Sequence, residues 1–336
     1  MNHRFINSRP IVVVFVIASL TTNLVAAQIS DPTVAAGYTL PRTADGHPDF
    51  DGFWSNATYT PMQQRDGVAG EFYTAEEVAA IEARMLDLES AQTVPGTTAD
   101  VHYDFTQFGL DRSQATLATG LRTSLIYDPP DGRIPPLTAE GQRIMAAREE
   151  QRGLRGAPYD AAENMNLSER CLIMRGSGPP MLDVGYNTNY QFVQNHNYVM
   201  ILVEMIHDAR IIPLDGREQA DAKISQWMGS SRGHWEGDTL VVETTNFNGK
   251  NPIYGSTANM RVTERFTRID DATLVYRFTI DDASMWTRPW SADSLMKKTI
   301  GPIFEHACHE GNYGMSNTLA GARLEEQLVE EETAAQ

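Results

Sequence analysis

The sequence predicts a mainly β protein whose second half is one antiparallel sheet. Four segments of strand length, rich in valine, threonine and aromatic residues, follow one another without helical patterns between them: 198–208, 237–247, 260–269 and 273–282. Adjacent antiparallel strands without interleaved helices are typical of barrels and strongly curved sheets. We therefore expect a lipocalin-like barrel or curved sheet over residues 165–324, with a two-sheet sandwich as the alternative.

Local patterns assign individual strands within this region. Segment 198–208 is apolar on both alternating faces, which is typical of a central, fully buried strand. Asp270-Asp271-Ala272 is a tight-turn signal. The segments on either side of that turn, 260–269 and 273–282, should therefore pair as a hairpin.

The preceding region, residues 28–164, is loop-rich and contains two predicted helices that pack on the barrel. Thr74 and Glu77 have the spacing of a capping box and begin a helix over 74–91. A second, polar helix is predicted over 138–152.

Two further stretches of this region have no helical pattern. Segment 124–137 holds four prolines and an Asp-Gly turn, so we expect it to run extended over the surface, outside the sheet. Phe53 and Trp54 follow turn signals and should dock on the larger β domain.

Residues 1–27 have the pattern of a secretory signal peptide. Arg4 and Arg9 precede an apolar run at 11–20, and small residues end the segment at Ala27. An apolar run of about ten residues is shorter than the roughly 20 that a membrane-spanning helix needs. We expect cleavage near Ala27 and an exported chain, periplasmic or secreted.

The charge of the chain limits its partners. The formal net charge is −17 at pH 7, and nucleic acids and anionic membranes are bound by basic surfaces. We therefore expect neither as a partner and predict a small-molecule or saccharide ligand. The end of the chain, 325–336, is acidic and weakly patterned, as in a solvated or disordered tail.

The chain has two cysteines, Cys171 and Cys308. In an oxidising compartment an even pair is usually a disulfide, and this is our prediction. The alternative is a nucleophilic Cys308 activated by His306 or His309, although an exported thiol would be open to oxidation.

Taken together, several motifs resemble a large family of exported bacterial proteins of unknown function. The resemblance covers nearly the whole chain after residue 27 and implies export but no activity. The motifs are PRTADGHPDFDGFW (41–54), SLIYDPPDGRIPPL (124–137), HDARIIPLDGR (207–217), SRGHWEGDTLVVETTNF (231–247), TRPW (287–290) and ACHEGNYG (307–314).

His207 is the first candidate for catalysis. Strand alternation places it on one face with Val199, Ile201, Val203 and Met205. At the rim of an apolar interior, an imidazole can act as a general acid or base near neutral pH. The alternative is a structural histidine bonded to backbone.

The segment FEHACHEGNYGM (304–315) supplies the other candidates. On a regular strand Glu305 and His309 share one face and His306 lies on the opposite one. We therefore predict Glu305 or His309 as the partner of His207. We expect no cofactor, because a metal ion would require a bend at Cys308 and a third, distant ligand such as His207.

Six further residues are candidate contacts for a substrate. The two arginines can neutralise a carboxylate, and the two tryptophans can stack on a sugar ring. The other two residues, an asparagine and a tyrosine, lie in a glycine-flanked turn. For each, the alternative is a structural role: solvated charge, core packing or backbone capping. The six are Arg210, Arg232, Trp286, Trp290, Asn312 and Tyr313.

Three functions remain open from the sequence. The first is an exported lyase or hydrolase that uses His207 with Glu305 or His309, and this is our leading hypothesis. The second is a periplasmic ligand-binding barrel without chemistry, and the third is a structural or partner-binding protein. Motifs for nucleotide binding, zinc proteolysis and serine esterase activity are absent from the sequence.

Overall fold

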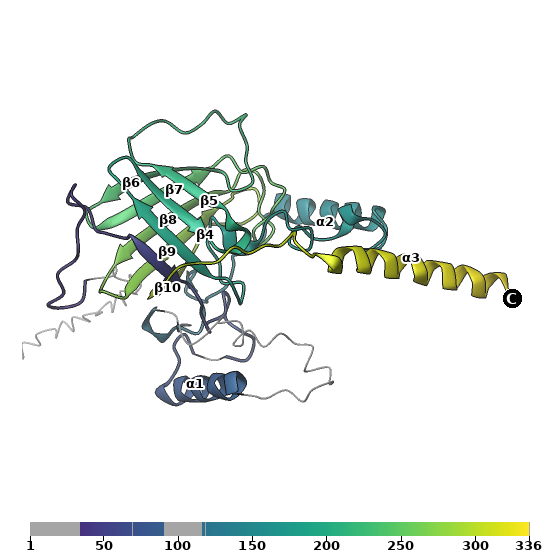
Figure 1. The fold of residues 1–336 in the computed structure, drawn as a ribbon, viewed down its shortest axis with the longest axis horizontal. Helices are drawn as coiled ribbons and strands as arrows, with labels where there is room; N and C mark the ends of the chain where they lie inside the picture. Colours follow the sequence, from purple (N-terminus) through teal and green to yellow (C-terminus); the bar gives the residue numbers. More distant parts are fainter. Residues whose placement is uncertain (1–33, 69, 91–115, 118, 336) are drawn as a thin grey trace, which may run out of the picture. The chain divides into compact units, whose positions relative to one another are not determined.

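A computed structural model of the chain describes residues 34–68, 70–90, 116–117 and 119–335 (Figure 1). The predicted signal at 1–27 lies outside these residues. The strands are β1 (Gly52–Ser55), β2 (Ile126–Asp128), β3 (Asn189–Gln194), β4 (Tyr198–Val203), β5 (Ala209–Pro213), β6 (Ser230–Glu236), β7 (Thr239–Thr245), β8 (Arg261–Arg268), β9 (Thr273–Asp281) and β10 (Trp290–Thr299). The α-helices are α1 (Ala75–Ser90), α2 (Ala139–Leu154) and α3 (Tyr313–Ala334).

The strands form one curved antiparallel sheet, which confirms the predicted mainly β class. Their order is β5-β4-β3-β1-β10-β9-β8-β7-β6, and β2 pairs beside this path with β10. The two edge strands, β5 and β6, lie side by side. Within the described residues they share no hydrogen-bonded ladder, so the sheet is not closed and the expectation of a barrel is wrong.

Side-chain packing fills the place where a closed barrel would have its last ladder. Gly233 of β6 faces Ile212 and Leu214, and a Cβ at Gly233 would lie 2.9 Å from Ile212 Cγ2 and 2.8 Å from Leu214 Cδ2. These apolar side chains occupy the space beside β6, so β5 and β6 meet through side-chain packing and not through backbone hydrogen bonds.

The segment around Trp54 is a central strand and not a docked loop. β1 pairs with β3 on one side and with β10 on the other, and Trp54 lies opposite Tyr190 and Lys298. Trp54 is fully buried, and its Nε1 donates to the Phe50 carbonyl oxygen at 2.9 Å. The N-terminal region therefore contributes a strand to the middle of the sheet.

Part of the proline-rich segment also belongs to the sheet. Ile126 pairs with Ala292 and Asp128 with Ser291 of β10, with a register shift between the two pairs. The expectation that 124–137 lies wholly outside the sheet is wrong for these residues. Pairing stops at Pro129 because proline has no N–H to donate.

The remaining strand predictions are confirmed with one change. Strands β8 and β9 pair as the predicted hairpin, from Arg268 opposite Leu274 to Arg261 opposite Asp281. Segment 198–208, however, is β4 followed by a turn, and β5 begins at Ala209. The expectation of a central, fully buried strand is wrong, because β4 lies next to the edge strand β5 and its residues alternate between buried and half-buried.

The two predicted helix starts are confirmed. Glu77 N donates to Thr74 Oγ1 at 3.2 Å and Thr74 N donates to Glu77 Oε2 at 2.7 Å, which completes the capping box of α1. Thr138 Oγ1 caps α2 by accepting from Gly141 N at 2.9 Å. The acidic end, 325–335, is exposed as expected, but it is helical because α3 continues through it.

None of the helices among the described residues has the length and apolar character needed to cross a bilayer.

A buried ion pair lies inside the sheet. Arg210 of β5 and Glu264 of β8 are 4% and 0% exposed and form a bidentate pair. Tyr276 of β9 donates its hydroxyl to Glu264 Oε1 at 2.8 Å and accepts from Met181 N at 2.9 Å. Burial and Glu264 hold the pKa of Tyr276 well above its usual value, so the hydroxyl keeps its proton and remains a donor.

Replacing Arg210 with methionine should destabilise the protein strongly, because Glu264 would stay buried without its cation. Breaking a buried pair in this way costs about 3–5 kcal/mol. Chemical denaturation followed by circular dichroism measures the change. The double variant R210M/E264L should recover much of the loss, since no buried charge is left unpaired.

Arg42 gives the matched control. It pairs with Asp238 at the surface, with side chains 44% and 39% exposed, and such pairs contribute little. R42A should therefore unfold close to wild type. If R210M also unfolds like wild type, the ion pair does not contribute as described.

Candidate functional site

The turn between β4 and β5 has a backbone conformation that side chains rarely adopt. Ile206 and His207 have positive φ angles of 64° and 47°, and a β-branched residue is an outlier in this region. Such residues cost on the order of 1–3 kcal/mol each and persist where neighbouring contacts impose them. The turn ends the regular strand before His207, so the predicted placement of His207 on one strand face with Val203 is wrong.

Contacts of Glu204 hold this turn against the C-terminal segment. Glu204 is 3% exposed, and its carboxylate accepts from Asn189 Nδ2 at 2.7 Å and from Phe304 N at 3.2 Å. His207 is exposed, and its Nδ1 lies 3.3 Å from the carbonyl oxygen of His306. The strained turn is thus fastened both to β3 and to the segment that follows β10.

A disulfide anchors the same segment. Cys171 and Cys308 are bonded with an S–S distance of 2.01 Å, across 137 residues of sequence. This confirms the predicted pairing and removes Cys308 as a thiol nucleophile. Segment 304–310 is extended coil and turn, so the strand expected there, with its alternating faces, is wrong.

His306 is the histidine that this segment brings to His207. It is half-buried, its ring lies 6.3 Å from that of Tyr186, and its Nδ1 has no hydrogen-bond partner among the described residues. Burial, followed by the neighbouring His207, lowers the pKa of His306, which favours the neutral imidazole.

The predicted partners of His207 are not brought to it. Glu305 and His309 are both exposed. In the part of the chain that the structure describes, no hydrogen bond, ion pair or ring contact joins either side chain to His207. His207 therefore approaches His306, whereas Glu305 and His309 face solvent.

Asn312 and Tyr313 begin α3. Asn312 Oδ1 accepts from Met315 N at 3.3 Å, and its Nδ2 donates to the Glu169 carbonyl oxygen at 3.2 Å. This is the backbone-capping role considered for Asn312. Tyr313 is 73% exposed.

A pocket of about 770 Å³ opens beside the edge strands, and we call it the edge pocket. It is lined by Asp208, Arg210, Trp227 and Arg232, among others. Arg232 donates to the carbonyl oxygens of Glu218 at 3.0 Å and Ser231 at 2.7 Å. The structure thus brings together two predicted substrate contacts, although the guanidinium of Arg210 is engaged by its buried ion pair.

Asp208 links the edge pocket to the strained turn. Burial raises the pKa of this carboxyl group, and the adjacent His207 acts in the opposite direction. Trp227, 39% exposed, offers an aromatic face at the same pocket.

Trp286 and Trp290 do not frame an opening. They are 2% and 0% exposed, and their rings meet edge to face with centroids 5.9 Å apart. They belong to the hydrophobic core, as in the packing alternative.

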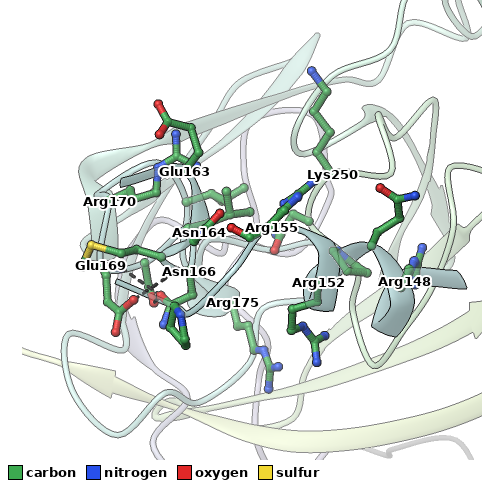
Figure 2. A pocket seen from close by; sticks show the side chains of 18 of the residues that line it. Arg148, Arg152, Arg155, Glu163, Asn164, Asn166, Glu169, Arg170, Arg175 and Lys250 are labelled. Atoms are coloured by element: carbon green, nitrogen blue, oxygen red, sulfur yellow. Dashed lines mark hydrogen bonds between the residues drawn. The ribbon is translucent and has the colours of Figure 1, made fainter. Parts of the chain in front are cut away.

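A larger groove of about 1500 Å³ lies between the end of α2, the loop that follows it and the loop around Lys250 (Figure 2). We call it the basic groove, after the six cationic side chains that line it. They are Arg148, Arg152, Arg155, Arg170, Arg175 and Lys250.

The strained turn lies between the two cavities. Met205 lines the basic groove, Asp208 lines the edge pocket, and Ile173 lines both. The sequence reading missed the groove, although three of its arginines recur at the end of the predicted helix, at positions 148, 152 and 155. The others come from loops whose approach no local pattern shows.

Comparison with known proteins gives no relative: no family model, no curated protein and no solved structure matches the chain. Among the described residues, no three histidine, cysteine, aspartate or glutamate side chains are grouped so that they could hold a metal ion.

Acidification should destabilise the protein partly through His306. Because its folded-state pKa is lowered, the unfolded chain binds this proton more readily, and stability falls as the pH drops below about 6.5. The variant H306Q lacks this proton and should lose less stability between pH 7.5 and 5.5 than wild type does. Thermal unfolding across that range measures the difference, with H309Q as the exposed control. Identical pH dependence of H306Q and wild type would contradict the burial of this ring.

Proposed function

We propose that the protein is an exported enzyme, a lyase or hydrolase, that applies acid–base chemistry to a carboxylate-bearing, carbohydrate-like substrate. The observation that carries the proposal is the strained turn at Ile206 and His207, where an exposed histidine directly precedes Asp208, which lines the edge pocket. Backbone strain of this kind clusters at functional sites, where surrounding contacts maintain it.

The hydrogen bond of His207 indicates which ring nitrogen would react. A carbonyl oxygen only accepts, so Nδ1 must carry the proton in the contact with His306 O. In the neutral ring, Nε2 then holds the free lone pair. His207 is accordingly assigned as the general base through Nε2.

Asp208 and Arg232 supply the other roles at the edge pocket. Burial raises the pKa of Asp208, and a carboxyl group with a raised pKa suits a general acid. Arg232 is placed to pair with a substrate carboxylate, and Trp227 to stack on a sugar ring. These residues replace Glu305 and His309 as the proposed partners of His207.

In the lyase form, His207 Nε2 takes a proton from the carbon beside the carboxylate. The electron pair of that C–H bond forms a carbon–carbon double bond, the bond to the β-oxygen breaks, and the departing oxygen takes a proton from Asp208. In the hydrolase form His207 takes its proton from water, and the water oxygen forms a bond to the sugar carbon of the glycosidic linkage. The bond from that carbon to the leaving oxygen breaks, and the departing oxygen takes a proton from Asp208. Proton exchange with solvent restores both residues.

Export is part of the proposal and is supported by the disulfide, since such bonds persist in oxidising compartments. A non-catalytic ligand-binding protein is the second candidate, supported by the size of the basic groove. Aromatic side chains such as Phe192, Phe266 and Tyr276 fill the core of the sheet. A ligand would therefore bind in an outer groove and not inside the sheet.

Replacing His207 with glutamine should remove turnover and leave the fold intact. Glutamine can keep a hydrogen bond to His306 O but cannot exchange a proton, and loss of a general base lowers rates about 10²–10⁴-fold. The assay follows new double bonds by ultraviolet absorption and new reducing ends, on a panel of carboxylated oligosaccharides.

The control is H309Q, which changes an exposed histidine of the disulfide-linked segment and should retain activity. Circular dichroism verifies that both variants are folded. A folded H207Q that turns over at the wild-type rate, or an H309Q that loses activity to the same extent, would contradict the assignment.

A further inference from the structure

The basic groove concentrates positive charge in a protein that is strongly acidic overall. The chain has a formal charge of −17, yet the groove combines six cationic side chains with three carboxylates, Glu149, Glu163 and Glu169. Positively charged side chains therefore outnumber negatively charged ones in the groove, although the chain as a whole is acidic, and this difference calls for an explanation.

Structural contacts explain two of the six cations. Arg148 donates to the carbonyl oxygens of Gly255 and Ser256, which fastens α2 to that loop. Arg152 pairs with Glu149 one turn earlier on the same helix.

The other four are Arg155, Arg170, Arg175 and Lys250, and none of them forms an ion pair with a described residue. Arg175 instead lies over the ring of Tyr254, 5.7 Å from its centroid. A cation at the end of α2 is also favoured by the helix dipole, which accounts for Arg155. It does not account for Arg170 and Lys250, which come from loops, or for Arg175, which begins a short 3-10 turn (Figure 2).

We propose that the basic groove binds a short acidic oligosaccharide, with Arg155, Arg170, Arg175 and Lys250 pairing with its carboxylates. The volume of about 1500 Å³ exceeds that of pockets for drug-sized molecules, so the ligand has several units. The acidic remainder of the protein repels long polyanions, which favours a ligand no longer than the groove.

The polar lining favours a sugar acid over a phosphate chain. Gln151 and Glu163 line the groove and are exposed, and their side chains form no hydrogen bond with other described residues. Glu163 can accept from a sugar hydroxyl, a donor that a phosphate chain does not offer. Tyr186, also in the lining, adds a ring for apolar contact with a sugar.

This inference does not depend on His207 being catalytic. The two proposals concern different side chains, and their tests can fail separately.

The test is isothermal titration calorimetry of the full-length mature protein with a trimer of galacturonate. Wild type should bind the trimer, and more weakly as the salt concentration rises. The methyl-esterified trimer, of equal length but uncharged, should bind at least tenfold more weakly. Each of R155A and R170A should lower the affinity for the charged trimer about tenfold or more, as expected for hydrogen bonds to a charged group.

R143A is the matched control. Arg143 lies on α2 as well, pairs with Glu140 and is not part of the groove lining, so R143A should bind like wild type. H207Q should also bind like wild type, which separates this test from that of the proposed enzyme.

Several outcomes would overturn the proposal. They are no binding of the charged trimer by wild type, equal binding of the esterified trimer, or equal losses in R143A and R155A. Tighter binding of tripolyphosphate than of the trimer would identify a phosphate site instead.

Discussion

The sheet depends on the pairing of β1 with two strands that are far from it in sequence. β3 lies on one side of β1 and β10 on the other, so this four-residue strand joins β5-β4-β3 to β10-β9-β8-β7-β6. Burial of Trp54 secures the join, since a fully buried aromatic side chain contributes a large apolar area. Without β1, the strands that flank the turn at His207 would share no backbone ladder with the larger part of the sheet among the described residues.

The same sheet explains why the two cavities lie where they do. β5 and β6 are its edges, and they meet through apolar side chains without a ladder. The edge pocket opens beside this incomplete closure. The buried pair of Arg210 and Glu264 connects β5 with β8 across the interior, which holds the two ends of the sheet together. The sheet therefore remains open between β5 and β6, while side chains fill its core.

The disulfide and Glu204 give the strained turn its second support. Cys171 lies in the loop that lines the basic groove, and Cys308 lies two residues after His306. Glu204 binds Phe304 N in the same segment. The disulfide and the hydrogen bond of Glu204 thus connect the loop, the turn and the C-terminal segment, although none of the three is a regular helix or strand. Irregular backbone that is fixed from several sides can keep functional groups in place without belonging to a helix or strand.

The sequence by itself determined the class of fold, the β8–β9 hairpin, both helix starts and the disulfide, because each rests on short-range patterns or on a single possible pairing. Only the tertiary structure decided that β1 is central, that the barrel stays open and that His207 meets His306. Strand alternation failed at His207 and at 304–310, since positive φ angles and a disulfide-anchored coil replace regular strand there. The basic groove was equally hidden, because its cations come from a helix end and from separate loops, and charges so far apart in sequence meet only through the fold.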